Sequence, residues 1–378
     1  MIVLDKSDII ETSKILVNKT SKGVLYLMRK SIIPMLSMLF LFLLLLMGAC
    51  SNDEQVEQEA TQEPEQTQSE PVEQEEPELP NVYPLTGERT EQSVDNRIVA
   101  VMVNNHPKAR PQTGLSQADI VFEILAEGNI TRFMALYQSE QPEQVGPVRS
   151  ARPYYFNTAD DYGALYIHHG AATFIENMLK DGAADYINGS YYDDDGHLFE
   201  RADFRRAPHN SYLQFGAVYE VAEEKGYETT AEYEPLPFLD EQDTKDITGS
   251  TATEVSFNYT STPVRYVYDS EAEKYHRYNG QEQTAELDTE EPIELDNVFI
   301  IATHHEVVDS AGRREVDLSS GGNAYLLQKG KVQKIQWENR DGRLLPVRDG
   351  EVVKFVPGKT WINVIPESPG LDDVQITE

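Results

Sequence analysis

Arginines that could bind an anion are concentrated in short motifs soon after residue 80. Residues 81–218 contain eleven basic residues, of which nine are arginine. A guanidinium is a rigid, always-charged fork that binds carboxylate or phosphate oxygens in pairs. If they converge, Arg110, Arg149 and Arg152 form a positive pocket for a peptidoglycan carboxylate, a wall-polymer phosphate or a lipid-linked sugar phosphate. The candidate ligand-binding residues are Arg110, Arg149, Arg152, Asn105, Gln112, Arg132 and Asn210.

The same arginines could instead form an internal ion-pair network. The acidic residues available for such a network are Glu123, Glu127, Asp119, Asp160 and Asp161. Breaking a buried ion pair costs about 3–5 kcal/mol, so arginines of this kind can matter without touching a ligand. The sequence leaves both interpretations open.

Histidines in the same region indicate a second kind of chemistry. An imidazole titrates near neutral pH, so His169 or His209 paired with Glu127 could act in general acid–base catalysis. Consecutive residues of a strand face opposite sides, so only one of His168 and His169 can point into such a site. The chain lacks a His-Glu-x-x-His sequence, a nucleophile elbow and a phosphate-binding loop. We expect no metal site and no cofactor.

The elements around these motifs predict a mixed α/β domain over residues 81–228. The wholly apolar run 98–103 predicts a strand that is covered on both faces. Ser150 followed by Pro153 predicts the start of a helix, and Ser211 is expected to cap another helix over 214–225. Further strands are expected over 119–126, 132–138 and 164–168, and a further helix over 172–180. Strands that alternate with helices favour an α/β or α+β arrangement.

The second half of the chain has the pattern of β-hairpins. Residues 229–250 are expected to form a connector, since most of them are polar or proline. Beyond it, short alternating runs are separated by turn pairs such as Asn279-Gly280 and Lys329-Gly330. We therefore predict an α+β fold class, with the mixed N-terminal domain followed by a mainly antiparallel β C-terminal domain. That domain is expected over 251–370, with a tail over 371–378.

Several of these motifs resemble those of the YerB-type bacterial lipoproteins, a family in two parts whose function is unknown. The matching segments are 105–114, 123–132, 146–153, 168–170 and 208–210. The resemblance covers about residues 82–370 and implies an N-terminal mixed domain, a C-terminal domain and a lipid anchor. It implies no activity.

Cys50 is the only cysteine, and it directly follows an apolar run that ends in Gly48-Ala49. Small residues before a cysteine resemble a bacterial lipobox, in which the thiol receives a diacylglyceryl group and a signal peptidase cuts before it. We therefore expect a signal peptide over 1–49 and an anchor of diacylglycerol and palmitate on Cys50. The alternative is an uncleaved transmembrane helix, because about 18 or more apolar residues can span a bilayer.

The basic residues before the apolar run predict that everything after Cys50 lies outside the cytoplasm. The protein is thus expected on the extracytoplasmic face of the bacterial cell membrane. Residues 1–27 have a second interpretation, a start codon assigned too far upstream, because Met28-Arg29-Lys30 begins like a signal peptide.

Residues 50–80 are expected to be the lipidated cysteine and a disordered acidic tether. Residues 51–80 contain ten Glu, one Asp and no Lys or Arg, so they cannot bury enough apolar surface to offset the entropy of ordering. The net charge is −33 for the chain, −11 for residues 51–80 and +3 for residues 1–50, which leaves −25 for residues 81–378. Nucleic-acid phosphates repel such an acidic body, so we expect no nucleic-acid partner.

Two functions remain as hypotheses. The favoured one is a lipoprotein that binds an anionic cell-envelope component or an envelope protein through its arginine-rich N-terminal domain. The alternative is an envelope hydrolase or transferase that acts on a cell-wall glycan or polymer with a Glu/His acid–base pair. The sequence does not identify the ligand, a reaction, the partner or the oligomeric state.

Overall fold

The apolar run 98–103 becomes strand β3 (Val99–Asn104), whose six residues are all buried, in a computed structural model of the protein. The structure describes residues 79–378 except 241 and 260–262. The expected signal peptide, Cys50 with its lipid, and residues 51–78 of the expected tether lie outside the described residues. Within the described ranges, no helix is long and apolar enough to cross a membrane.

Strand β3 belongs to a 12-stranded central sheet with the order β23-β22-β21-β20-β17-β24-β4-β5-β3-β7-β8, and β11 pairs with β21. The other strands of this sheet are β4 (Ile120–Glu127), β5 (Ile130–Tyr137), β7 (Leu165–His168), β8 (Tyr186–Asn188), β11 (Ser250–Thr251), β17 (Asn297–Thr303), β20 (Gly322–Gln328), β21 (Lys331–Arg340), β22 (Arg343–Arg348), β23 (Glu351–Val352) and β24 (Thr360–Pro366). Because β3, β7 and β8 are parallel, their carboxyl ends share one edge of the sheet, where ligands bind in open α/β sheets.

Both faces of the central sheet are covered, as the doubly buried β3 requires. Ala100 and Met102 face a cluster that includes Tyr155 of α2, whereas Val99 and Val101 face the opposite cluster. The α-helices of the described residues are α2 (Pro153–Asp161), α3 (Thr173–Lys180) and α4 (Val218–Glu224). A three-stranded sheet consists of β6 (Gln144–Val145), β10 (Ser211–Gln214) and β9 (Phe199–Arg201).

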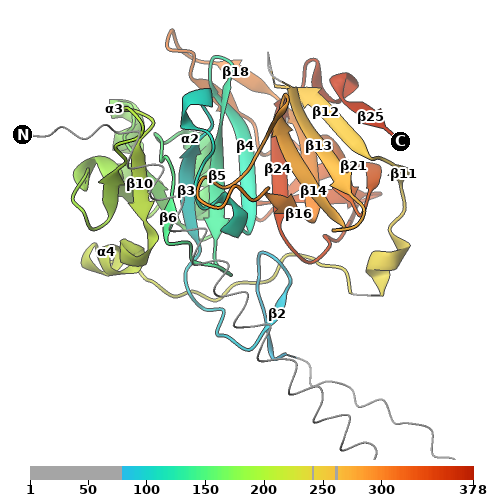
Figure 1. Ribbon diagram of the computed structural model, residues 1–378, viewed down its shortest axis with the longest axis horizontal. Helices are drawn as coiled ribbons and strands as arrows, with labels where there is room; N and C mark the ends of the chain where they lie inside the picture. Colours follow the sequence, from blue (N-terminus) through green and yellow to red (C-terminus); the bar gives the residue numbers. More distant parts are fainter. Residues whose placement is uncertain (1–78, 241, 260–262) are drawn as a thin grey trace, which may run out of the picture. The chain divides into compact units, whose positions relative to one another are not determined.

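A six-stranded sheet contributes to the same opposite cluster and is visible in Figure 1 in yellow and orange, with β25 in red. Its strands are β12 (Glu254–Asn258), β13 (Pro263–Asp269), β14 (Lys274–Asn279), β15 (Glu282–Gln283), β16 (Glu294–Leu295) and β25 (Gln375–Thr377). Two short pairs complete the strands: β1 (Asn81–Val82) with β2 (Arg89–Thr90), and β18 (His305–Val307) with β19 (Arg314–Val316).

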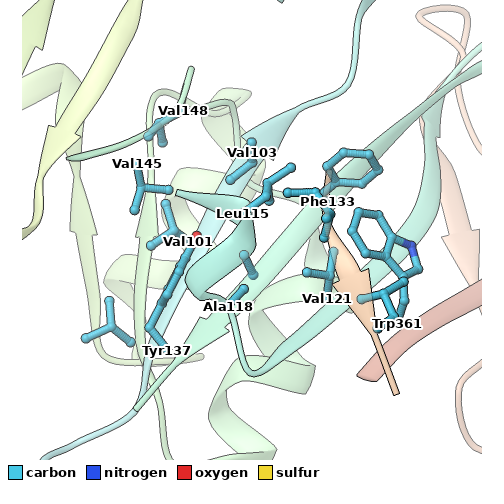
Figure 2. Close-up of a cluster of buried hydrophobic side chains, with 14 of the residues drawn as sticks. Val101, Val103, Leu115, Ala118, Val121, Phe133, Tyr137, Val145, Val148 and Trp361 are labelled. Carbon is cyan, nitrogen blue, oxygen red and sulfur yellow. The ribbon is translucent and has the colours of Figure 1, made fainter. Parts of the chain in front are cut away.

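Strand β24, from the C-terminal end of the chain, joins the two halves into one sheet. It runs parallel to β4 on one side and to β17 on the other, with Ile362 opposite both Phe122 and Phe299. Figure 2 shows Trp361 beside Phe133 and Val121, and the ring centroids of Trp361 and Phe133 are 4.9 Å apart. The connector over 229–250 and the domain bounds on either side of it stay predictions. The parts of the chain before and after it share both the central sheet and a hydrophobic core.

The predicted fold class is confirmed: the N-terminal half is mixed, and the C-terminal half is built of mainly antiparallel strands. The helix that Ser211 was expected to cap is wrong at its start. Residues Ser211–Gln214 form β10 because they pair with β6 and β9, and the helix begins only at Val218. Residues 375–377, within the expected tail, form β25 and pair with β12.

Candidate functional site

Two histidines stack on each other just beyond the carboxyl end of β3. His106 caps the short 3-10 helix Pro107–Ala109, and its Nδ1 accepts a hydrogen bond from the N–H of Lys108 at 3.1 Å. Its ring stacks on that of His209, with centroids 4.5 Å apart and planes at 28°. Asn104 contacts both residues: its Oδ1 accepts from the N–H of His106 at 3.0 Å, and its Nδ2 lies 2.9 Å from Nδ1 of His209.

These contacts fix the neutral tautomer of each imidazole. A backbone N–H can only donate, so Nδ1 of His106 accepts and the proton of the ring is on Nε2. The N–H of His106 likewise holds Oδ1 of Asn104, which leaves the Asn104 amide nitrogen to donate to Nδ1 of His209. Among the residues that the structure describes, neither Nε2 atom has a hydrogen-bond partner. Each ring therefore offers an unused Nε2–H donor.

Arg149 reaches the same place through an extended segment that lies between β3 and the end of β7. Its N–H donates to Met102 O at 2.8 Å, and its carbonyl accepts from the N–H of His169 at 2.9 Å. Gly146 starts this segment, where a Cβ atom would lie 2.8 Å from the ring of Tyr212, so the close approach requires glycine. We define the histidine–arginine site as Asn104, His106, Arg149 and His209.

The electrostatics of this site are dominated by burial and positive charge. Burial, followed by the charge of Arg132, lowers the pKa of Arg149 to about 10. Burial also lowers the pKa of His106 and of His209, and the charges of Arg149 and Lys108 lower both further. Within residues 79–378 as described, the Arg149 side chain makes no ion pair and no hydrogen bond. It is thus a partly buried cation without a protein counter-ion, in a body of net charge −25.

Arg132 and Arg152 are placed differently, because both form ion pairs with Glu127 at the end of β4. Nη2 of Arg132 lies 2.9 and 2.7 Å from the two carboxylate oxygens of Glu127, and Arg152 pairs with one of the same oxygens. The two arginines are only 4% and 3% exposed. Arg132 and Arg152 therefore form the internal ion-pair network that was the alternative to an anion-binding pocket.

The acid–base pair gains no support from this geometry. Both oxygens of Glu127 are held by arginines, and no hydrogen bond or ion pair in the described part of the chain joins it to a histidine. His169 instead pairs with Asp193 at 3.1 Å. Asn210 accepts from Arg201 at 2.8 Å and so supports the same loop region. A catalytic role for Glu127, His169 or His209 stays a prediction.

Arg110, Asn105 and Gln112 surround the loop that follows β3. Arg110 donates from Nε to Asn105 Oδ1 at 3.0 Å and from Nη2 to Asn105 O at 2.9 Å. Gln112 donates to the carbonyl of Asn104 at 3.0 Å and thereby holds the start of the loop. Of the predicted binding residues, the structure therefore brings only Arg149 together with His209. The others contact the loop after β3, Glu127 or Arg201 instead.

Sequence reasoning missed a fully buried ion pair next to this loop. Glu123 of β4 and Arg277 of β14 are both 0% exposed, with Nη2–Oε1 and Nε–Oε2 distances of 2.7 and 3.0 Å. The carboxylate also accepts from Thr131 at 2.9 Å and from the indole of Trp361 at 3.1 Å. The guanidinium carbon lies 5.2 and 5.0 Å from the ring centroids of Phe133 and Trp361. We call Glu123 and Arg277 the buried pair.

Sequence reasoning also did not single out His106, and a sequence signal existed both for this histidine and for the buried pair. His106 follows a buried strand by two residues and precedes a proline, which is a typical position for a binding loop. In β14, Tyr275, Arg277 and Asn279 alternate with outward residues, so an arginine at an inward position signals a buried partner. No group of three or more His, Cys, Asp or Glu side chains in the described ranges is arranged to hold a metal ion.

Comparison with known proteins identifies a family, a relative and a solved structure to which this chain is similar. Residues 85–228 match the N-terminal domain of a protein of unknown function (DUF3048), and residues 253–362 match the C-terminal domain of the same family. YerB of Bacillus subtilis (strain 168), which is named as a lipoprotein, is 47% identical over 287 residues, or 75% of this chain and 86% of YerB. The crystal structure of the Bacillus subtilis YerB protein superposes with a TM-score of 0.72 at 44% identity. That match covers 79% of this chain and all of the other.

Proposed function

The chain belongs to the DUF3048 family, as its motifs indicated, and on that premise we propose that it is an extracytoplasmic lipoprotein that binds an anionic cell-envelope component at the histidine–arginine site. A relative that is named as a lipoprotein supports the membrane anchor, for which Cys50 is the candidate lipidation residue. The anchor would hold the site near the outer surface of the membrane, where wall polymers are within reach.

The observation that carries the proposal is the unpaired guanidinium of Arg149. Arg132, Arg152 and Arg277 each have a carboxylate partner, whereas Arg149 has none among the described residues, and burial, followed by the charge of Arg132, lowers its pKa. Holding such a cation partly buried is unfavourable unless an anion completes the arrangement. A bound anion would supply that missing partner.

The two imidazoles define what kind of anion fits. Each neutral ring donates from Nε2, and Arg149 adds a charged fork, so the donors exceed the acceptors at this point. Tetrahedral phosphate and planar carboxylate oxygens both accept several such bonds. The shared chemistry is therefore an oxyanion on a wall polymer, from either a phosphate-containing polymer or a peptidoglycan peptide.

The test is binding of the full-length protein, purified in detergent, to two preparations: isolated phosphate-containing wall polymer, and peptidoglycan stripped of that polymer. We expect Arg149→Ala to lower affinity by about ten-fold or more, since a hydrogen-bonded charge contributes on this scale. Arg149→Lys should retain part of the affinity. Arg340→Ala is the matched control, because Arg340 is 37% exposed and already paired with Glu338.

The melting temperature separates binding from structure in the same samples. An unchanged melting temperature together with lost binding supports the proposal. Wild-type affinity of Arg149→Ala for both preparations would refute it, and an equal loss of stability and binding would return Arg149 to a structural role.

A further inference from the structure

A cavity with both polar and apolar lining residues lies next to the histidine–arginine site, between the two halves of the chain. Its volume is about 280 Å³. Its lining includes Asn105, Arg110, Glu123, Thr131, Tyr259 and Asn279. Pockets for drug-sized ligands measure roughly 300–1,000 Å³, so this cavity suits a smaller molecule. His106 also lines it, which makes the cavity continuous with the stacked histidines.

The floor of the cavity is buried, polar and internally satisfied. Thr131 and Tyr259 are each 6% exposed, and both donate to Glu123, to its carboxylate and its backbone carbonyl respectively. The buried pair is neutral as a unit, because the charges of Glu123 and Arg277 cancel. The floor is thus pre-formed and carries no net charge.

Among the described residues of the lining, Arg110 and Asn279 have donors that are available to a ligand. Arg110 uses the side of its guanidinium that carries Nε and Nη2 to bind Asn105. Its other edge, formed by Nη1 and Nη2, has one long contact of 3.5 Å to Glu282, whose side chain is 52% exposed. An arginine edge of this kind accommodates the two oxygens of a carboxylate or phosphate.

Asn279 supplies the second independent observation. Its Oδ1 accepts from Nη2 of the buried Arg277 at 3.2 Å, which assigns the amide nitrogen to the other side. That nitrogen has no hydrogen-bond partner in the described part of the chain, although the residue is only 9% exposed. Asn279 lines the cavity, and its amide nitrogen is not one of the fully buried side-chain atoms that lack a partner, so an acceptor from a ligand can reach it.

We infer that this cavity is a binding site for a monosaccharide-sized polar ligand that carries one oxyanion. The oxyanion binds the free edge of Arg110 and displaces Glu282, and a ring or side-chain oxygen accepts from Asn279. The hydroxyl and amide groups of the lining suit a sugar's hydroxyls, its apolar residues Pro107, Ile130 and Val264 suit the sugar ring, and Arg110, whose Glu282 partner is half exposed, suits one acidic group. The inference concerns Arg110 and Asn279 and does not depend on the role of Arg149.

The probes are glucose 1-phosphate, glucuronate and glucose, titrated into the full-length protein by calorimetry. The first two distinguish a phosphate from a carboxylate, and binding of either supports the inference. We expect glucose to bind about ten-fold more weakly or worse, because it lacks the charge-assisted pair. Equal affinity for all three probes, or no binding of any of them, would overturn the inference.

Two variants with opposite expected effects keep the test independent of folding. Arg110→Gln should weaken binding of the charged probe about ten- to a hundred-fold, although it also removes contacts to Asn105. Glu282→Gln removes only the competing exposed carboxylate and should tighten binding several-fold. An unchanged or weaker affinity of Glu282→Gln would contradict the arrangement, whatever happens to Arg110→Gln.

Arg149→Ala separates this inference from the proposed function. The variant should bind the preferred sugar probe like wild type while losing the wall polymer. If it loses the sugar probe as well, the cavity is not a separate site and the inference fails. If it keeps both ligands, the proposed function fails and the inference stands.

Discussion

The buried pair and the histidine–arginine site use the same kind of cation in opposite ways. Arg277 is fully buried, bonded to Glu123 through two nitrogens and flanked by Phe133 and Trp361. Arg149 is less buried and has positive neighbours, with no carboxylate partner in the described ranges. Arg277 therefore acts within the fold, whereas Arg149 is available to a ligand.

The difference shows that partners, rather than residue type, distinguish structural from binding arginines. Desolvating a charge costs several kcal/mol, which is on the order of the whole free energy of unfolding of a small domain. Good geometry and hydrogen bonds can compensate for this cost. The buried pair meets that condition inside the protein. At the histidine–arginine site, the compensating charge would come from a bound anion. Mutations at the buried pair should therefore lower stability, whereas mutations at the histidine–arginine site should lower ligand binding.

The largest expected effect is at the buried pair. Arg277→Met should lower the free energy of unfolding by about 3–5 kcal/mol, because it leaves the Glu123 carboxylate buried without a counter-charge. Urea denaturation monitored by tryptophan fluorescence measures the change. The control is Arg277→Met combined with Glu123→Leu, which removes both charges and should recover part of the loss. A single variant within 1 kcal/mol of wild type would contradict this account of the pair.

An intermediate effect is expected where Arg132 and Arg152 share Glu127. Glu127→Gln should cost about 1–3 kcal/mol, because two nearly buried guanidinium groups lose their charged acceptor. The loss should be smaller than at the buried pair, since the Glu127 side chain is 33% exposed and water can solvate the cluster. The same urea experiment checks it. If turnover on purified wall fragments is detected in wild type, its survival in Glu127→Gln would remove this carboxylate from any catalytic scheme.

A smaller effect on stability is expected at Arg149 itself. Arg149→Ala should change the free energy of unfolding by at most about 0.5 kcal/mol, as for substitutions that break no internal partner. A slight gain in stability is consistent with lost repulsion from Arg132. Calorimetric melting in ligand-free buffer measures it. A loss as large as that of Glu127→Gln would mean that Arg149 has a structural partner after all.

The sequence predicted the elements of this comparison better than their pairing. Hydrophobic period and turn residues located β3, β4, β5, α2 and most C-terminal hairpins, because those signals are local. The pairing of β24 with β4 joins residues more than two hundred positions apart, and Arg277 pairs with Glu123 across 154 positions, so neither can be predicted from local signals. The sequence therefore identified Arg149 and His209 as candidates, but only the tertiary arrangement shows that Arg149 lacks an acid and Arg132 does not.

The smallest expected effect is the pH dependence of the histidine–arginine site. Burial lowers the folded-state pKa of both histidines, and neighbouring positive charges lower it further. For His106 these charges are Lys108, Arg110 and Arg149. For His209 they are His106 when protonated, Arg149, Lys108 and Arg205. Between that lowered pKa and the unfolded value of about 6.5, the unfolded state binds more protons. This contribution to stability is therefore complete above about pH 6.5 and is lost as the pH falls through the folded-state pKa.

His106→Asn isolates this contribution, because asparagine can still accept from the N–H of Lys108 as a cap. The free energy of unfolding should fall less between pH 7 and pH 5 in the variant than in wild type. Binding of an anionic polymer should change in the opposite direction, since a bound negative charge favours protonated imidazoles, so wild-type affinity should rise as the pH falls. His168, whose pKa burial lowers to about 4, titrates in both proteins and cancels in the comparison. If polymer affinity depends on pH identically in the variant and in wild type, His106 does not take part in anion binding, and Arg149 carries the charge of the site.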